Sequence, residues 1–244
     1  MGMMNVGNPF RRAAIFGTTG GIGAALATRL AESGIEVWAG SRSGAAADPA
    51  LRAFRFDLSD EASIAAAAGA MADAPPDLVV VASGVLTLAD GSGPERSYKQ
   101  IDGAAMDEVF RLNTIGPALV AKHVLPLLPR DRRSVFAALS ARVGSIGDNR
   151  IGGWHSYRAS KAALNMLLKN FAIELGRTHK QAIVAGLHPG TVDSALSEPF
   201  QANLPAGQLT RPADAADNLL NVIDGLTVAD SGGVFDWKGE AVPA

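Results

Sequence analysis

A tyrosine and a lysine stand four residues apart, Tyr157 and Lys161, in a stretch whose spacing predicts a helix. Residues at this separation share one helix face. A free phenol loses its proton near pH ~10, and a neighbouring ammonium favours the phenolate and lowers that pKa. We therefore predict general acid–base chemistry, in which Tyr157 protonates a carbonyl oxygen or deprotonates an alcohol. The compact charge of Lys161 can also donate to a ribose hydroxyl.

An asparagine, Asn113, lies inside the predicted helix 106–128, among mostly apolar neighbours. A buried amide needs hydrogen-bond partners, so we interpret Asn113 as a residue that holds a water relaying protons to Lys161. The alternative is an asparagine on the helix surface. Gly116 and Pro117 follow closely and predict a local irregularity of the helix under either interpretation.

A glycine-rich turn, GTTGGIG at residues 17–23, follows a predicted strand and precedes a predicted helix. Glycines permit a tight turn and a close approach to a pyrophosphate, and the helix start offers free N–H groups and a positive dipole end. A turn without a ligand is the alternative, but the strand–turn–helix context favours a dinucleotide site. The residues expected to contact the dinucleotide are Gly17, Thr19, Gly20, Gly21, Ile22 and Gly23.

The end of the second predicted strand indicates which dinucleotide binds. An NAD-specific site usually has an acidic residue there, whereas this chain has Ser41 and Arg42. A guanidinium pairs with a 2′-phosphate, so NADP(H) is favoured over NAD(H); an exposed loop charge is the alternative. Asp57, after the third predicted strand, either accepts a hydrogen bond from the adenine amino group or, like Ser59, caps a helix.

These residues need a scaffold, and the chain alternates short apolar runs with longer segments of helical spacing. Such alternation predicts an α/β fold with a parallel sheet covered by helices on both faces. The predicted strands are 13–16, 34–39, 53–58, 78–81, 134–139, 181–187 and 234–237. The predicted helices are 22–33, 61–72, 106–128, 156–176 and 213–223.

No linker divides the chain, so we predict one domain over residues 1–244. Two long loops, 86–102 and 191–210, each follow a predicted strand. Ligands of open α/β sheets bind outside the carboxyl ends of the strands. We therefore expect these loops to form a substrate pocket and a lid.

Composition excludes several other classes. The 244 residues include no cysteine, which excludes disulfides, thiolate zinc sites and cysteine nucleophiles. The four histidines show no metal-ligand spacing, so no metal is expected, and no GxSxG segment indicates a serine hydrolase. A net charge of −2 without a long basic run argues against nucleic acid. No apolar run suits a membrane span or a signal peptide, so we expect a cytoplasmic location.

The order of motifs resembles the short-chain dehydrogenase/reductase family. GTTGGIG is followed by Ala82-Ser83-Gly84, by Asn113, by YRASK around Tyr157, and by HPGTVDS at residues 188–194. The resemblance extends over nearly the whole chain. The segment SARVGSIGDNRIGGWHSYRASKAALN is similar to the branch that contains bacterial C-factor proteins and sniffer-type carbonyl reductases.

The resemblance implies a single-domain, doubly wound Rossmann fold with seven parallel strands. It also implies an NADP(H)-dependent carbonyl reductase or alcohol dehydrogenase that transfers hydride at the nicotinamide C4. Tyr157 would be the acid and base, Lys161 its pKa-lowering and ribose-binding partner, and Asn113 part of the proton relay.

Further cofactor contacts follow from the same resemblance. Pro189 and Gly190 would flank the nicotinamide, and Thr191 or Ser194 would contact its carboxamide or phosphate. The other residues expected around the cofactor are Leu58, Ser83, Gly84 and Val192, together with Asn113, Tyr157 and Lys161.

Two departures from the family pattern affect the strands. Phe16 stands where the family usually has threonine, and Val81 and Ala82 replace two asparagines. We expect these changes to weaken the support between strands more than the cofactor contacts.

A third departure affects the reacting centre. The position of the family's catalytic serine is Ala141, and Ser140 lies one residue earlier. A shift by one residue on a strand turns a side chain to the other face unless a bulge re-aims it. We expect Ser140 to orient the substrate carbonyl, with Ser145 as the second candidate.

Two kinds of function remain open. The first is an enzyme acting on an uncharged small-molecule carbonyl or alcohol, and the second is a non-catalytic NADP(H)-binding signalling or sensor protein. A nucleotide-sugar epimerase would need a larger C-terminal substrate domain. We also expect a homodimer or homotetramer. Four apolar residues of the predicted helix 156–176 either supply the subunit interface or face the sheet: Leu164, Leu167, Leu168 and Phe171.

Overall fold

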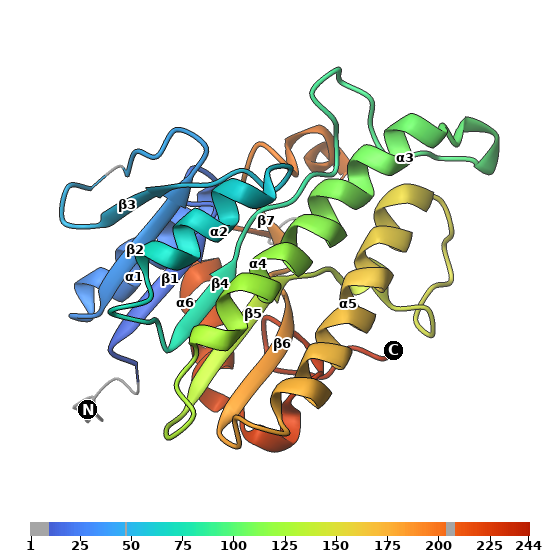
Figure 1. The fold of residues 1–244 in the computed structure, drawn as a ribbon. Helices are drawn as coiled ribbons and strands as arrows, with labels where there is room; N and C mark the ends of the chain where they lie inside the picture. Colours follow the sequence, from blue (N-terminus) through green and yellow to red (C-terminus); the bar gives the residue numbers. More distant parts are fainter. Residues whose placement is uncertain (1–9, 47, 204–207) are drawn as a thin grey trace, which may run out of the picture.

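Seven parallel strands form one sheet in the computed structural model, which describes residues 10–46, 48–203 and 208–244 (Figure 1). The strand order is β3-β2-β1-β4-β5-β6-β9, so the order reverses between β1 and β4. The doubly wound Rossmann fold expected from the sequence is confirmed, and its ligand crevice is expected at this reversal. The strands are β1 (Arg12–Phe16), β2 (Glu36–Ser41), β3 (Arg52–Arg55), β4 (Leu78–Val81), β5 (Ser134–Leu139), β6 (Ala182–His188) and β9 (Val234–Asp236).

Helices cover both faces of the sheet (Figure 1). One face carries α1 (Gly21–Glu32) and α6 (Pro212–Gly225), and the other carries α2 (Glu61–Ala70), α4 (Gly116–Val124) and α5 (His155–Leu175). The aliphatic run of β4 is buried on both faces, as parallel strands between two helix layers require. Helix α3 (Gly103–Phe110) packs against α5.

An aromatic cluster fills the end of the core where the family pattern has threonine. The ring of Phe16 meets Phe54 at 4.9 Å and Phe56 at 5.1 Å between centroids, both edge to face. Gly40 makes room for it, since a Cβ there would lie 2.4 Å from the Phe54 ring.

Two hydrogen bonds join the ends of β1 and β4, where the departures from the family pattern lie. The backbone N–H of Ala82 donates to the carbonyl of Phe16 over 2.8 Å, and the hydroxyl of Ser83 donates to the same oxygen over 3.1 Å. The weaker support expected between these strands stays a prediction.

Three of the four apolar residues named for helix α5 pack into the core. Leu164 and Leu168 are each 1% exposed and belong to the core beneath the sheet, and Phe171 packs against the same core. These three residues favour the alternative in which the helix faces the sheet, whereas Leu167 is half-buried. The homo-oligomer and its interface stay predictions.

The predicted loop 191–210 contains short regular elements. Strands β7 (Thr191–Val192) and β8 (Leu209–Thr210) pair in a separate parallel ribbon, and a 3₁₀ segment spans Glu198–Asn203. The rest of the predicted lid, residues 204–207, lies outside the described residues, as do residues 1–9 of the predicted domain. In the described part of the chain, no helix is both long and apolar enough to span a bilayer.

Candidate active site

A cleft of about 1620 Å³ opens at the C-terminal ends of the strands. Its wall contains the glycine turn, the ends of β2, β4, β5 and β6, and parts of both long loops. The predicted cofactor and catalytic residues line this cleft with three exceptions, Gly23, Asn113 and the second serine candidate Ser145. The topology therefore brings residues from seven separate segments to one site.

The glycine turn is built by close packing. Gly17 has a φ of 113°, and a Cβ on it would lie 2.3 Å from the Ser83 hydroxyl. A Cβ on Gly23 would lie 2.1 Å from the carbonyl oxygen of Gly17, so Gly23 is required by the turn rather than by the cleft. Helix α1 starts at Gly21 without a side-chain cap and without an acidic residue in its first turn. Its first N–H groups therefore suit an anion.

Arg42 and Ser41 lie at one end of the cleft. Ser41 is 1% exposed, and its hydroxyl donates to the carbonyl of Ala45 over 2.8 Å. Arg42 is exposed and forms no ion pair with another described residue. The guanidinium is thus available for an anionic group, whereas the Ser41 hydroxyl is already used by its own loop.

Asp57 lines the cleft, but it does not cap a helix. Its Oδ1 accepts from the N–H and the hydroxyl of Ser59, each over 2.8 Å. These bonds, with a smaller contribution from Arg42, hold the pKa of Asp57 below its ordinary value. The cap of α2 is Asp60, whose side chain accepts from Ala62 and Ser63. The interpretation of Asp57 or Ser59 as the cap is therefore wrong, because the helix starts at Glu61, one residue later than a cap at Ser59 requires.

Asn113 is fully buried in a π-helical turn, Arg111–Ile115, that interrupts the predicted helix 106–128. Its side-chain amide pairs with Val85, donating to the carbonyl and accepting from the N–H, each over 2.8 Å. It also donates to the Ser160 hydroxyl over 3.3 Å. Pro117 has no N–H for the carbonyl of Asn113 four residues earlier, which explains the irregularity.

Gly84 lies between Asn113 and the lysine. A Cβ on Gly84 would lie 2.9 Å from Asn113 Oδ1 and 3.4 Å from Lys161 Nζ. Both polar atoms therefore border the same small space at the end of β4. Asn113 lies outside the cleft lining and contacts it through Val85, which lines the cleft.

Tyr157 and Lys161 lie together on α5, with the ammonium 5.8 Å from the centre of the phenol ring. Lys161 is 4% exposed, and its Nζ donates to the carbonyl of Leu139 over 2.8 Å. Burial lowers the pKa of Lys161 to about 8. Burial also raises the pKa of Tyr157 to about 12. This direction is opposite to the one expected from the sequence, because burial disfavours the charged phenolate.

Neither serine candidate donates into the cleft. Ser140 lines it, but its hydroxyl donates to Asn165 Oδ1 over 2.6 Å. Ser145 is 2% exposed, and its hydroxyl accepts from the N–H of Asp148. Ala141, the position of the family's serine, lines the cleft without a polar group. The substrate-orienting role of Ser140 or Ser145 therefore stays a prediction that these contacts do not favour.

The segment after β6 forms the floor beside Tyr157. Gly190 has a φ of 76°, and a Cβ on it would lie 3.2 Å from the ring of Trp237. His188 also packs against Trp237, with ring centroids 5.6 Å apart. Burial lowers the pKa of His188 to about 4, so the imidazole is neutral at physiological pH. Pro189 and the backbone at Thr191 and Val192 complete this wall.

Sequence reasoning missed three residues that shape the site. Glu95 accepts from the backbone and hydroxyl of Ser156 at the start of α5, Trp154 lines the cleft beside Tyr157, and Asn165 holds Ser140. Of these three residues, only Trp154 had a signal in the sequence, namely its position three residues before Tyr157. Glu95 and Asn165 act through contacts between distant parts of the chain, which no local pattern predicts.

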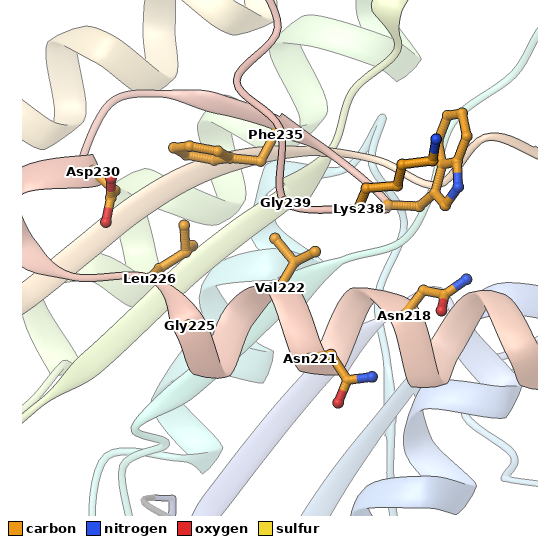
Figure 2. Close-up of a pocket in the computed structure, with 10 residues that line it drawn as sticks. Asn218, Asn221, Val222, Gly225, Leu226, Asp230, Phe235, Lys238 and Gly239 are labelled. Carbon is orange, nitrogen blue, oxygen red and sulfur yellow. The ribbon is translucent and has the colours of Figure 1, made fainter.

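A second pocket of about 460 Å³ lies between α6 and the turn after β9 (Figure 2). Val222 of α6 and Leu226, which directly follows the helix, point toward the side of the pocket where Phe235 lies. This pocket contains none of the predicted site residues. Within the described segments, no group of three histidine, aspartate or glutamate side chains suits a metal ion.

Comparison with known proteins agrees with this geometry. The profile of the short chain dehydrogenase family matches residues 11–205. The C-signal protein of Myxococcus xanthus is 34% identical over 169 residues, which cover 69% of this chain and 93% of that protein. The 1-hydroxy-2-glutathionyl-2-methyl-3-butene dehydrogenase of Rhodococcus sp. (strain AD45) is 37% identical over 123 residues, covering 50% of this chain and 51% of that protein.

Solved structures share the whole fold. Carbonyl reductase Sniffer of D. melanogaster superposes with a TM-score of 0.81 at 18% identity, covering 96% of this chain and 99% of the other. NADPH-bound carbonyl reductase from chicken fatty liver gives a TM-score of 0.81 at 25% identity, covering 96% and 94%. Since the family profile spans most of the chain and the C-signal protein is a 34% identical relative over 69% of it, this chain belongs to the short-chain dehydrogenase/reductase family.

Proposed function

We propose that this protein is an NADP(H)-dependent oxidoreductase that interconverts a small carbonyl compound and its alcohol, with Tyr157 as the acid and base. The observation that carries the proposal is the continuity of the cleft. One cavity is lined by the glycine turn and Arg42 as well as by Tyr157 and Lys161. A dinucleotide bound along it would have its phosphates at the turn and its reactive ring near the phenol.

The residues present fit a phosphorylated dinucleotide. The uncapped start of α1, without an acidic residue in its first turn, suits the pyrophosphate. Arg42 has no ion-pair partner among the described residues and would hold the 2′-phosphate. Asp57 and Leu58 would border the adenine, and the wall from Pro189 to Val192 would border the nicotinamide.

Structural neighbours bind both kinds of cofactor. The chicken fatty liver enzyme contains NADPH, and a short-chain dehydrogenase/reductase from Burkholderia multivorans contains NADP, with a TM-score of 0.79 at 23% identity, covering 97% of this chain and all of that chain. A ketoacyl reductase from Brucella melitensis contains NADH. The preference proposed for this chain therefore depends on Arg42.

The proton chemistry follows from Tyr157. The nicotinamide, when bound, supplies the hydride that reduces the carbonyl carbon. Tyr157 gives its phenolic proton to the carbonyl oxygen as that oxygen takes the electron pair of the C=O bond. A phenol with its pKa raised to about 12 is protonated at neutral pH, so it is ready for this reduction. The phenolate left behind is stabilised by the ammonium of Lys161.

Ala141 leaves Tyr157 as the proposed hydrogen-bond donor to the substrate oxygen. Ala141 has no hydroxyl, and the hydroxyl of Ser140 donates to Asn165. The orientation of the substrate beyond its hydrogen bond to Tyr157 must therefore come from the shape of the cleft.

A second function is kept because of two observations. The C-signal protein, a 34% identical relative, is named for a signal rather than for an enzyme activity. In addition, this chain has Ala141 where the family usually has a serine, so a polar group is missing from the reacting centre. A non-catalytic NADP(H)-binding sensor would retain the cofactor end of the cleft and would not need a polar group at position 141.

A panel of aldehydes, ketones and quinones with NADPH oxidation as the readout separates the two functions. Turnover of any panel member that is lost in Tyr157→Phe supports the enzyme. Tight NADPH binding without turnover of any member supports the sensor. Absence of both contradicts the dinucleotide site itself.

A further inference from the structure

Trp154 has a backbone conformation that side chains rarely adopt. Its φ of 51° and ψ of 45° are left-handed, and it is the one non-glycine residue with positive φ in the described part of the chain. Gly152 and Gly153, with φ of 69° and 66°, make a run of three left-handed residues with it. A bulky residue in this conformation is strained and persists only when its surroundings hold it.

Glu95 is the residue that holds it. The N–H of Trp154 donates to the backbone carbonyl of Glu95. The Glu95 side chain is 9% exposed, and it accepts from the N–H of Ser156 over 3.1 Å and from the Ser156 hydroxyl. Burial favours the neutral carboxyl, but the bonds from Ser156 outweigh it and keep the pKa of Glu95 below its ordinary value. One residue of the loop 86–102 thus fixes both Trp154 and the start of α5.

The indole fixed in this way faces the reacting centre. Its ring lies 6.2 Å from the Tyr157 ring, edge to face. Phe200, from the opposite loop, lies 5.2 Å from the indole. All three rings line the cleft, so a molecule that reaches the Tyr157 hydroxyl passes along an aromatic wall.

Apolar side chains line the same cleft as these three rings, among them Leu86, Val143 and Ala141. Charged side chains line the cleft as well. Arg142 is paired with Asp148 over 2.6 Å, and Arg96 forms no ion pair with another described residue. The three rings themselves offer a flat apolar surface, which suits an uncharged ring.

We propose that Trp154, positioned by Glu95, determines specificity by stacking a planar, uncharged ring that carries the reacting carbonyl. The inference builds on the proposed function and assigns its substrate class. Stacking supplies the orientation that a second hydroxyl beside Tyr157 would otherwise supply. Aromatic rings gain energy from such contacts beyond the area that they bury.

Two ketones of matched size test the wall: acetophenone, which has a planar ring, and cyclohexyl methyl ketone, which has a saturated one. The variants are Trp154→Phe and Trp154→Leu, which carry the same backbone strain and differ in the ring. The ratio of kcat/KM for the two ketones cancels the intrinsic reactivity when variants are compared. Trp154→Phe is expected to keep most of the ratio, and Trp154→Leu to lower it by about 2- to 10-fold. Equal ratios in all three proteins overturn the proposal.

Binding to the unmodified protein gives an independent readout that needs no turnover and no variant. Benzamide and cyclohexanecarboxamide are compared with NADPH present. The saturated ring is at least as hydrophobic, so burial of area alone favours it. Tighter binding of benzamide supports the stacking wall, and equal or weaker binding contradicts it. If no ketone is reduced, the proposed activity is contradicted, but this binding measurement still tests whether the aromatic wall prefers a planar ring.

The positioning role of Glu95 has its own variants. Glu95→Ala removes the acceptor for Ser156 and is expected to lower the ketone ratio as Trp154→Leu does, with NADPH affinity unchanged. Glu95→Gln keeps an oxygen acceptor and is expected to restore the ratio. An unaltered ketone ratio in Glu95→Ala would show that Glu95 does not position Trp154. Loss of NADPH binding in this variant would show that the whole site is disrupted, which contradicts a local positioning role for Glu95.

Discussion

Replacing Lys161 by methionine is expected to stabilise the folded protein while it abolishes activity. The side chains have similar length, and Lys161 is 4% exposed. Its ammonium has one hydrogen bond to protein, to the carbonyl of Leu139. A buried charge with so little compensation lowers the stability of the fold.

The magnitude follows from the pKa. Burial lowers the pKa of Lys161 from 10.5 to about 8. Each pKa unit corresponds to about 1.4 kcal/mol, so keeping the charge costs the folded state about 3 kcal/mol at pH 7. Losing the bond to the Leu139 carbonyl costs the variant about 1 kcal/mol at every pH. The variant should therefore be more stable by about 2 kcal/mol at pH 7.

The pH dependence is the sharper part of this prediction. Because the folded-state pKa of Lys161 lies below its unfolded value, its destabilising effect is full below pH ~8 and disappears as the pH rises through ~10.5. At pH ~10 the charge costs about 1 kcal/mol, which cancels the lost hydrogen bond. The stability advantage of Lys161→Met should therefore vanish there.

Urea unfolding of both proteins at several pH values from 7 to 10 measures this difference. Lys169→Met, an exposed lysine of the same helix, is the matched control and should show a difference that does not change with pH. If the difference in unfolding free energy between Lys161→Met and the unmodified protein stays constant across this range, the conclusion that the Lys161 ammonium is buried at a cost to stability is wrong.

Three further outcomes are expected. Tyr157→Phe should lower kcat for reduction by about 100-fold or more with NADPH affinity nearly unchanged, and retained turnover would remove Tyr157 from the mechanism. Arg42→Ala should weaken NADPH binding by about 10-fold or more in a fluorescence titration and leave NADH binding unchanged; equal losses would contradict its phosphate role. Ser140→Ala should cost about 1 kcal/mol of unfolding free energy without a large change in kcat/KM, since its hydroxyl donates to Asn165; a loss of activity without a loss of stability would instead assign Ser140 to the substrate.

The scaffold was predictable because its signals are local. A short apolar run that ends in glycine and is followed by helical spacing specifies one strand and its helix, and repetition of that unit specifies the doubly wound sheet. Each predicted strand overlaps an observed strand of the seven-stranded sheet. The alternation also fixes which loops lie at the carboxyl ends of the strands, so the location of the cleft follows from the same pattern.

The features that could not be predicted depend on contacts between residues far apart in the sequence. The irregularity expected near Pro117 is confirmed as a π-helical turn, but the burial of the Asn113 amide against Val85 joins segments 28 residues apart. The pKa direction of Tyr157 depends on burial, and the spacing to Lys161 contains no measure of burial. The partners of Ser140 and Glu95 lie 25 and 61 residues away in sequence, beyond any local pattern.

Three costly features lie together at the start of α5. The left-handed Trp154, the phenol of Tyr157 with its raised pKa and the buried ammonium of Lys161 lie within eight consecutive residues. Asp77 shows the contrasting case: it is 1% exposed, and it accepts from the N–H groups of both Arg11 and Arg12. Strain and uncompensated charge persist in folded proteins mainly where function requires them. The uneven distribution of these costs is therefore a physical argument, independent of sequence similarity, for chemistry at Tyr157.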